Sequence, residues 1–403
     1  MHTNKRKKWR TLLLLSLAEL LAMVVWFSAS AVTNDLTELW QLDAGGQAWL
    51  TMSVQIGFVV GALGSAILTL ADRIPARWFF IGSTFLAATT TALIPIMADS
   101  PTIAMLLRFL TGIFLAGVYP IGMKIMATWT KEDRGLGIGL LVGALTIGSA
   151  APHLLNALGG LGQWQRVLYL AAGLATVGAI IGIFFVYEGP HATKAAKFRI
   201  GDVRYVITDR KVMLANLGYL GHMWELYAMW AWLFFFLSAS FAVSNTNANW
   251  AGFVTFFSIA IGGVGSVIAG QLADRIGRTT VTSVSMLISG ACALIIGQFF
   301  GANPIILTAI ALVWGFFIVA DSAQFSASVS ELADSRYVGT ALTLQTSMGF
   351  LLTLFTIRMI PSLQRWVGWE WAFAFLAIGP VIGIWAMQAL KRMQQQESVT
   401  QSL

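Results

Sequence analysis

Apolar runs of about 20 residues follow one another along almost the whole chain, with only short polar gaps between them. A helix of that length crosses the roughly 30 Å of hydrocarbon in a bilayer. Only 11% of the 403 residues are charged, whereas an ordinary soluble protein carries about 25%. We therefore expect an all-α membrane protein with twelve transmembrane helices and no soluble domain. The predicted spans are residues 11–32, 48–69, 78–97, 102–127, 135–158, 166–187, 212–240, 250–270, 280–300, 304–329, 337–360 and 371–390.

The Lys and Arg residues sort to one side of the predicted membrane. If the chain starts in the cytoplasm, that side receives Lys5, Arg6, Lys7, Lys8, Arg10, Arg73, Arg77, Lys131, Arg134, Lys194, Lys197, Arg199, Arg204, Arg210, Lys211, Arg275, Arg278, Arg336, Lys391 and Arg392. The membrane and the far side receive Arg108, Lys124, Arg166, Arg358 and Arg365. The positive-inside rule then predicts a multi-pass protein of the plasma (inner) membrane with both termini in the cytoplasm. Topology thus explains the net charge of +7, and we expect no nucleic-acid partner.

The basic start of the chain, followed by an apolar run and by Ala29, Ser30 and Ala31, is also compatible with a cleaved secretory signal. The run is long for a signal core and contains Glu19 near its middle. Both features favour a first helix that is retained.

The chain contains an internal repeat with an offset of 202 residues. LADRIPAR at 70–77 returns as LADRIGRT at 272–279, and the same offset relates Arg134 to Arg336 and Trp164 to Trp366. The copies are expected at residues 1–187 and 212–403, with residues 188–211 as a basic cytoplasmic loop. Because each copy has six spans, both enter the membrane from the same side, which predicts parallel repeats. Transporters of this type move two halves about a central site.

Three short motifs carry a resemblance to the major facilitator superfamily. GQLADRIGRTT, from Gly270 to Thr280, resembles its signature between the second and third helices of a half. LTLADRIPARW is a degenerate first copy, with Leu68 and Pro75 in place of glycines. LLRFLTGIFLAG, from Leu106 to Gly117, resembles the fourth-helix motif. The resemblance covers the whole chain and implies two pseudo-symmetric six-helix bundles that transport a solute by alternating access.

In that superfamily the loop of the signature latches one half against the other when the cytoplasmic gate is closed. The resemblance therefore implies a gate at Asp72, Arg73, Asp274, Arg275 and Arg278. The alternative is that these residues only anchor the turn under the positive-inside rule.

Ionisable residues at membrane depth are costly and mark candidate functional sites. Apart from His153, they lie on the first, fourth, seventh and tenth spans, and the resemblance to the major facilitator superfamily implies that these spans line the central cavity. The candidates for substrate or proton binding are Glu19, Arg108, Lys124, His222, Glu225, Asp321 and Gln324. Glu19 and Asp321 are expected roughly 12 Å deep, near the midplane. Each can bind a proton or the substrate, or can form a permanent ion pair or a protonated hydrogen-bonded group.

GHMWELYAMWAW, from Gly221 to Trp232, is the densest group of such residues. His222 and Glu225 are three residues apart, so they share a helical face on which they can share a proton. Trp224 and Tyr227, together with Trp26, predict an aromatic cavity suited to an organic cation or a planar ring. Trp230 and Trp232 are interpreted as packing or interface residues.

Two basic residues at membrane depth, Arg108 and Lys124, are candidates for binding an anion. The resemblance implies that Arg108 takes part in proton coupling or pairs with a cavity carboxylate. Lys124 either binds substrate or extends to the membrane surface. An anionic substrate held by these two residues remains an alternative.

The sequence thus predicts a secondary active transporter of a small solute, coupled to protons, with an organic cation or aromatic compound as substrate. The alternatives are an organic-anion carrier that uses Arg108 and Lys124, or a lipid or drug exporter. Motifs of ATPases, metalloproteases and nucleophile elbows do not occur, so we expect no enzyme, cofactor or metal site. The single cysteine, Cys292, excludes an intramolecular disulfide. The expected partners are the solute, protons and the lipid bilayer, and the expected state is a monomer.

Overall fold

The computed structural model describes residues 2–130, 134–159, 163–191, 200–247, 249–334 and 336–402, and these are almost entirely α-helical. The long helices of the first bundle are α1 (His2–Met23), α3 (Ala44–Ile67), α5 (Ala76–Met97), α6 (Pro101–Leu115) with α7 (Tyr119–Trp129), α8 (Arg134–Gly159) and α9 (Trp164–Phe185). Those of the second are α11 (Arg210–Val243), α12 (Asn249–Ile276), α13 (Arg278–Ile295), α14 (Pro304–Ala320) with α15 (Ser322–Leu332), α16 (Val338–Val367) and α18 (Ile378–Ser402). The short elements are η1 (Ser30–Val32), α2 (Thr33–Trp40), α4 (Leu70–Arg73), η2 (Ile200–Asp202), α10 (Val203–Thr208), η3 (Ile296–Phe299), α17 (Trp369–Ala372) and η4 (Phe373–Ala377).

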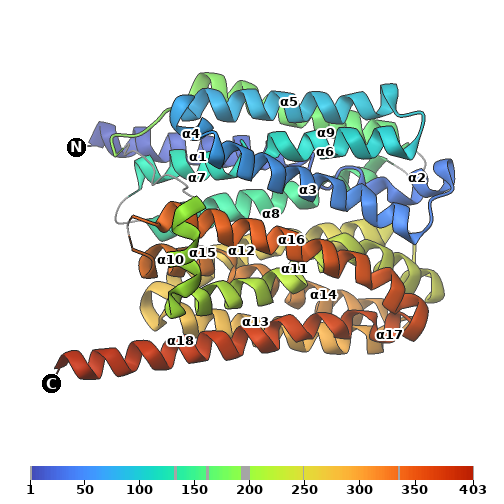
Figure 1. Cartoon of the computed structure of the whole chain (residues 1–403). Helices are drawn as coiled ribbons and strands as arrows, with labels where there is room; N and C mark the ends of the chain where they lie inside the picture. The colour runs from blue at the N-terminus through green and yellow to red at the C-terminus, as the bar shows by residue number, and fades with distance from the viewer. Residues whose placement is uncertain are drawn as a thin grey trace.

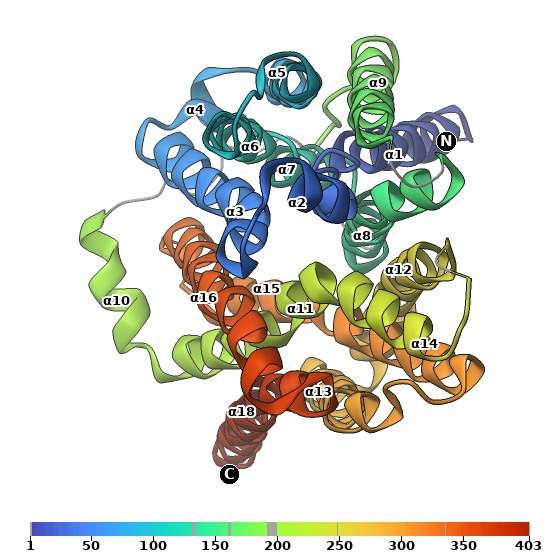
Figure 2. The ribbon, with the colours of Figure 1, turned by 90° about the vertical axis from the view of Figure 1, so that its right-hand side faces the viewer.

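The long helices run side by side, and both termini lie at the same end of the molecule (Figure 1). We call this end the terminal face, and the end that carries α2 and α17 the opposite face. Figure 2, which looks along the helices, shows α1 to α9 gathered on one side and α11 to α18 on the other. The predicted fold class, an all-α membrane protein of two six-helix bundles, is confirmed.

Among the described residues, eleven helical segments are long and apolar enough to cross a membrane. The expected first span is the one that differs. It was predicted to run from 11 to 32, but α1 ends at Met23 and the chain then turns irregularly until η1. Every residue from Val24 to Thr33 is buried. Irregular backbone at membrane depth is tolerated where protein surrounds it, and this is the case here.

The fourth helix of each bundle is interrupted at an equivalent point. In the first bundle α6 ends at Leu115 and α7 begins at Tyr119, and in the second α14 ends at Ala320 and α15 begins at Ser322. The offset of 202 residues aligns Tyr119 with Asp321. The two interruptions are therefore a property of the repeat, and they bring a polar side chain to the same depth in each bundle.

The two LADRI segments fold differently. In the second copy, α12 continues through the motif and the chain turns at Gly277, which has φ +88°. In the first copy Pro75 holds that position, and proline is confined to φ near −65°. The turn is made earlier instead, at Thr69 with φ +51°, before the short helix α4. The two copies therefore turn six positions apart, and the proline at residue 75 excludes the later turn in the first copy.

The bundles contact each other mainly along α8 with α12 and along α3 with α16. Glycines allow the first contact to be close. A β-carbon on Gly263 of α12 would lie 3.1 Å from the Cα atom of Gly143, and one on Gly139 of α8 would lie 3.3 Å from the Cα atom of Val267. This is the small-residue packing of membrane helices, used here between the bundles.

Candidate functional site

Arg108 of α6 is fully buried, and its guanidinium binds the irregular segment that follows α1. Nη1 donates to the backbone oxygen of Val25 at 2.7 Å and lies 3.4 Å from the hydroxyl of Ser28. Nη2 donates to the backbone oxygen of Trp26. The ion pairs of the described residues do not include Arg108. The structure therefore places this cation against peptide carbonyls rather than against a cavity carboxylate.

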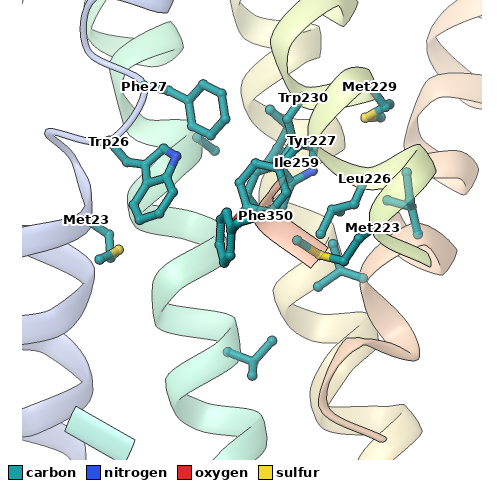
Figure 3. Close-up of a cluster of buried hydrophobic side chains, with 14 of the residues drawn as sticks. Met23, Trp26, Phe27, Met223, Leu226, Tyr227, Met229, Trp230, Ile259 and Phe350 are labelled. Atoms are coloured by element: carbon teal, nitrogen blue, oxygen red, sulfur yellow. The ribbon is translucent and has the colours of Figure 1, made fainter. Parts of the chain in front are cut away.

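Six aromatic side chains meet between the two bundles, and we call them the aromatic seal. They are Trp26, Phe27, Phe58, Tyr227, Trp230 and Phe350. Figure 3 shows Trp26 and Phe27, on the segment after α1, facing Tyr227, Trp230 and Phe350 of the second bundle. All six are buried. Sequence reasoning included only Trp26 and Tyr227 of these six in the aromatic cavity.

The contacts of the aromatic seal cross the boundary between the bundles. Ring centroids are 6.0 Å apart for Trp26 and Tyr227, 5.9 Å for Phe27 and Trp230, and 4.6 Å for Phe58 and Phe350. A hydrogen bond of 2.6 Å from Thr353 to Gln55 crosses the same boundary. The indole N–H groups of Trp26 and Trp230 are buried without an acceptor among the described residues. The aromatic seal is thus apolar but contains two unpaired donors.

His222 and Asp321 form a buried pair inside the second bundle. Nδ1 of His222 on α11 lies 2.9 Å from Oδ1 of Asp321, and both side chains are almost fully buried. Asp321 occupies the interruption between α14 and α15. The ring of Phe325 lies 5.5 Å from the imidazole. The partner expected for His222 was Glu225, three residues along the same helix, but the structure gives this imidazole a partner from the tenth span.

Glu225 faces a different part of the second bundle. Its Oε1 accepts from the indole of Trp314 at 2.6 Å, and its Oε2 accepts from the hydroxyl of Ser289 at 2.9 Å. Trp224 lies outside the aromatic seal, because its ring packs on Phe355 and Phe375. The dense motif on α11 is therefore distributed over three separate contacts and does not form one cavity.

Both carboxyl oxygens of Glu19 are buried without a hydrogen-bond donor among the described residues. Its side chain is fully buried in the first bundle. It fits against α7 because residue 122 is glycine: a β-carbon there would overlap Oε2 of Glu19. This carboxyl therefore lies between α1 and α7, the first-bundle counterparts of the elements that hold His222 and Asp321.

Lys124 and Gln324 point toward the terminal face. Lys124 donates to the backbone oxygen of Ala71 in α4, so it tethers the first LADRI segment. The amide oxygen of Gln324 accepts from Nη1 of Arg278 at 2.7 Å. The side chain of Gln324 therefore belongs with the residues expected at the gate, while its backbone N–H donates to the backbone oxygen of Asp321 at 2.9 Å.

Among the side chains that the structure describes, residues expected at the gate are brought together in the second bundle. Arg278 binds Glu331 of α15, with Nη2 2.6 Å from Oε1, and lies 3.7 Å from Asp274. Arg73 and Arg275 are exposed. Asp72 lies in α4, but its side chain is outside the described residues. Glu331 was not identified from the sequence, because a Glu near a helix end in a polar gap has no distinguishing pattern.

Comparisons with known proteins agree with this architecture. A model of the family described as Major Facilitator Superfamily matches residues 15–248, more than half of the chain. The 4-hydroxybenzoate transporter PcaK of Pseudomonas aeruginosa is 22% identical over 412 residues, which cover 94% of this chain and 85% of that protein. The gentisate transporter of Corynebacterium glutamicum is 25% identical over 152 residues, which cover 37% of this chain and 33% of that protein. The crystal structure of the nucleoside transporter NupG matches with a TM-score of 0.72 at 16% identity, covering 94% of this chain and 99% of that one.

Proposed function

Since this chain belongs to the Major Facilitator Superfamily and is a multi-pass membrane transporter of small solutes, we propose that it carries a small aromatic carboxylic acid together with protons. The aromatic seal is the observation that carries this proposal. It lies where the two bundles meet, so it must part when the path between the bundles opens. When the rings of the aromatic seal separate, they lose their contacts with one another, and a planar aromatic solute can replace those ring–ring contacts.

Two energetic features favour a solute with a ring and an oxygen acceptor. Each pair of aromatic rings contributes about 0.5–1.5 kcal/mol beyond the area it buries. A buried donor without an acceptor costs about 1–3 kcal/mol, and the indoles of Trp26 and Trp230 are two such donors. A carboxylate or hydroxyl oxygen of the solute removes that cost. The names of the 4-hydroxybenzoate and gentisate transporters support this class of solute.

We propose that the pair of His222 and Asp321 binds the coupled proton. An imidazole and a carboxyl 2.9 Å apart share protons as one unit. When the pair in its imidazolium–carboxylate form gains a proton, the carboxylate of Asp321 is neutralised and the ionic part of the contact is lost. The link between α11 and the interruption of the tenth span then weakens, which couples protonation to movement within the second bundle. Glu225 supports the bundle in this scheme and does not contact the solute.

We further propose that the terminal face is cytoplasmic and that the protein lies in the plasma (inner) membrane. The described cations of that face include Arg73, Arg77, Arg204, Arg275 and Arg336, as the positive-inside rule requires. In this proposal residues 188–211 link two halves of one functional monomer that needs no cofactor and performs no chemical conversion.

The test for the solute uses purified protein in proteoliposomes. Uptake of labelled 4-hydroxybenzoate, gentisate, uridine and benzyltrimethylammonium is measured with an imposed pH gradient. We expect uptake of the two aromatic acids and at least a tenfold loss of that uptake in Tyr227→Ala. Trp224→Ala is the matched control, because it removes a large ring from the same helix outside the aromatic seal. Equal losses in the two variants, or uptake of the cation alone, would reject the proposed solute.

The test for coupling separates exchange from accumulation. Asp321→Asn and His222→Gln should still exchange labelled for unlabelled solute across vesicles without a gradient, but should no longer accumulate it when a pH gradient is applied. Glu225→Gln should keep both activities in the protein that remains folded. If Asp321→Asn accumulates solute as the wild type does, the proton is bound elsewhere.

An organic cation is a second candidate solute, and one observation favours it. Both oxygens of Glu19 lack a donor among the residues that the structure describes, so a cationic group would satisfy them. Bound ligand raises stability by RT ln(1 + [L]/Kd). Stabilisation of the wild type by benzyltrimethylammonium, absent in Glu19→Gln, would support the cation over the aromatic acid.

A further inference from the structure

We propose that Arg108 keeps the first membrane-spanning helix interrupted and thereby positions Trp26 and Phe27 for closure of the aromatic seal. Arg108 is then a positioning residue for the aromatic seal between the bundles. This inference does not depend on which solute is carried or on where the proton binds.

The guanidinium supplies donors where the helix stops supplying them. Carbonyls in an α-helix accept from the amide four residues ahead, and α1 ends at Met23. In the segment that follows, the oxygen of Val25 accepts from the hydroxyl of Ser28 at 2.9 Å, but the amide of Ser28 reaches it only at 3.5 Å. Arg108 donates to the oxygens of both Val25 and Trp26 in place of the missing helical amides. The planar fork of an Arg side chain can reach two neighbouring acceptors at once.

The repeat provides an internal control. The residue equivalent to Arg108 in the second bundle is Ile310, which offers no donors. The equivalent stretch of α11 is not interrupted: this helix runs from Arg210 to Val243. The interruption therefore occurs in the copy that has a guanidinium to take over the carbonyls, and the copy without it keeps its own helical hydrogen bonds.

The interruption decides where two rings of the aromatic seal point. Successive residues of an α-helix differ by about 100° around its axis, so a continuous helix would point two neighbours in different directions. Trp26 contacts Phe350 and Tyr227, and Phe27 contacts Tyr227 and Trp230. Figure 3 shows both side chains directed at the second bundle. The irregular backbone, which Arg108 holds in place, turns both neighbouring side chains toward the second bundle.

The test measures separation of the bundles without solute. Cys292 is the single cysteine, so Cys292→Ala gives a cysteine-free background. Thr353→Cys then reports on the boundary, because Thr353 is fully buried and bonded to Gln55 of the other bundle. Ala293→Cys, buried within the second bundle, is the control for general loosening. The rate of modification by a membrane-impermeant thiol reagent is compared in Arg108, Arg108→Lys and Arg108→Gln backgrounds, with the reagent on either side.

We expect Arg108→Gln to raise the modification rate at Thr353→Cys at least tenfold, and Arg108→Lys to raise it less, since Lys keeps the charge but not the fork. The rate at Ala293→Cys should not change. If Arg108→Gln does not fold, the inference depends on Arg108→Lys, where at least a threefold rise is expected. An unchanged rate at Thr353→Cys, or an equal rise at both cysteines, would overturn the inference, because Arg108 would then act on proton binding or on overall stability.

Discussion

Glu19 and Gly122 fit together so closely that any side chain at residue 122 would displace the carboxyl. A β-carbon at this position would overlap Oε2 of Glu19, and its next neighbours would include the ring of Phe80 at 3.7 Å. Gly122 lies in the first turns of α7, and a glycine within a helix lowers stability by roughly 0.5–1 kcal/mol relative to alanine. That cost is explained by the space which the buried carboxyl needs.

Gly122→Ala should destabilise the protein, because the overlap with Glu19 outweighs the gain in helix propensity. Gly82→Ala is the matched control: it lies in α5 with nothing within 4 Å of the added β-carbon, so it should be neutral or stabilising by up to about 1 kcal/mol. The thermal unfolding midpoint in detergent measures both. Glu19→Ala combined with Gly122→Ala should recover part of the loss, and failure to do so would contradict the proposed overlap.

Glu225 and Trp314 should show strong energetic coupling. Glu225→Gln keeps the shape but turns one acceptor into a donor, so a buried N–H or O–H of Trp314 or Ser289 loses its partner, at a cost of about 1–3 kcal/mol. A double-mutant cycle with Trp314→Phe, followed by chemical unfolding in mixed micelles, should give a coupling energy above about 0.5 kcal/mol. Additive effects would mean that the hydrogen bond does not stabilise the bundle.

Arg278 and Glu331 should matter more for transport than for stability. The ion pair is partly exposed, with 59% of the Glu331 side chain accessible, and such pairs contribute less than about 1 kcal/mol. Arg278→Ala should therefore leave the unfolding midpoint almost unchanged while altering the transport rate severalfold. Exchange of the two charges in Arg278→Glu with Glu331→Arg should restore part of the rate, because the amide of Gln324 can donate as well as accept, whereas the new carboxylate at residue 278 lies close to Asp274. A rate that shows no recovery would mean that the pair does not act through its charges.

Gly263 should tolerate no branched side chain. A β-carbon on Gly263 would lie only 3.1 Å from the Cα atom of Gly143 in the other bundle. Overpacking of this kind costs about 1–3 kcal/mol. Gly263→Val should lower both the unfolding midpoint and the uptake rate. Gly173→Val is the comparison, since α9 has nothing within 4 Å of that position; equal losses in the two variants would assign the effect to helix propensity.

The loop between α15 and α16 should not contribute to pH dependence in the working range. Arg336 holds the pKa of the exposed Asp334 carboxyl at about 2, mainly through side-chain hydrogen bonds. A lowered pKa means that the stabilising contact is present above the ordinary range of an Asp and is lost as the pH falls toward 2. Asp334→Asn should therefore leave the pH profile of uptake between about 4 and 8 unchanged. A shifted profile would place this loop in the coupling mechanism.

Much of the architecture follows from the sequence. The length and number of the apolar runs predict the helices, and the LADRI repeat predicts two bundles of the same kind. Even the local difference between the two LADRI segments is explained by sequence, since a proline at residue 75 excludes the turn that Gly277 makes. These features depend on residues that are close along the chain or on the thickness of the bilayer, so they can be predicted from the sequence alone.

The partners of the buried polar groups were decided by tertiary structure. Helical periodicity places His222 and Glu225 on one face of α11, but it does not say which helix lies against each of them. The structure pairs His222 with Asp321 and Glu225 with Trp314. In the same way, apolarity predicts that residues 24–32 lie in the membrane, whereas their irregular backbone depends on Arg108, some eighty residues away along the chain. The bilayer selects which residues are buried, but only packing between distant helices selects which of them meet.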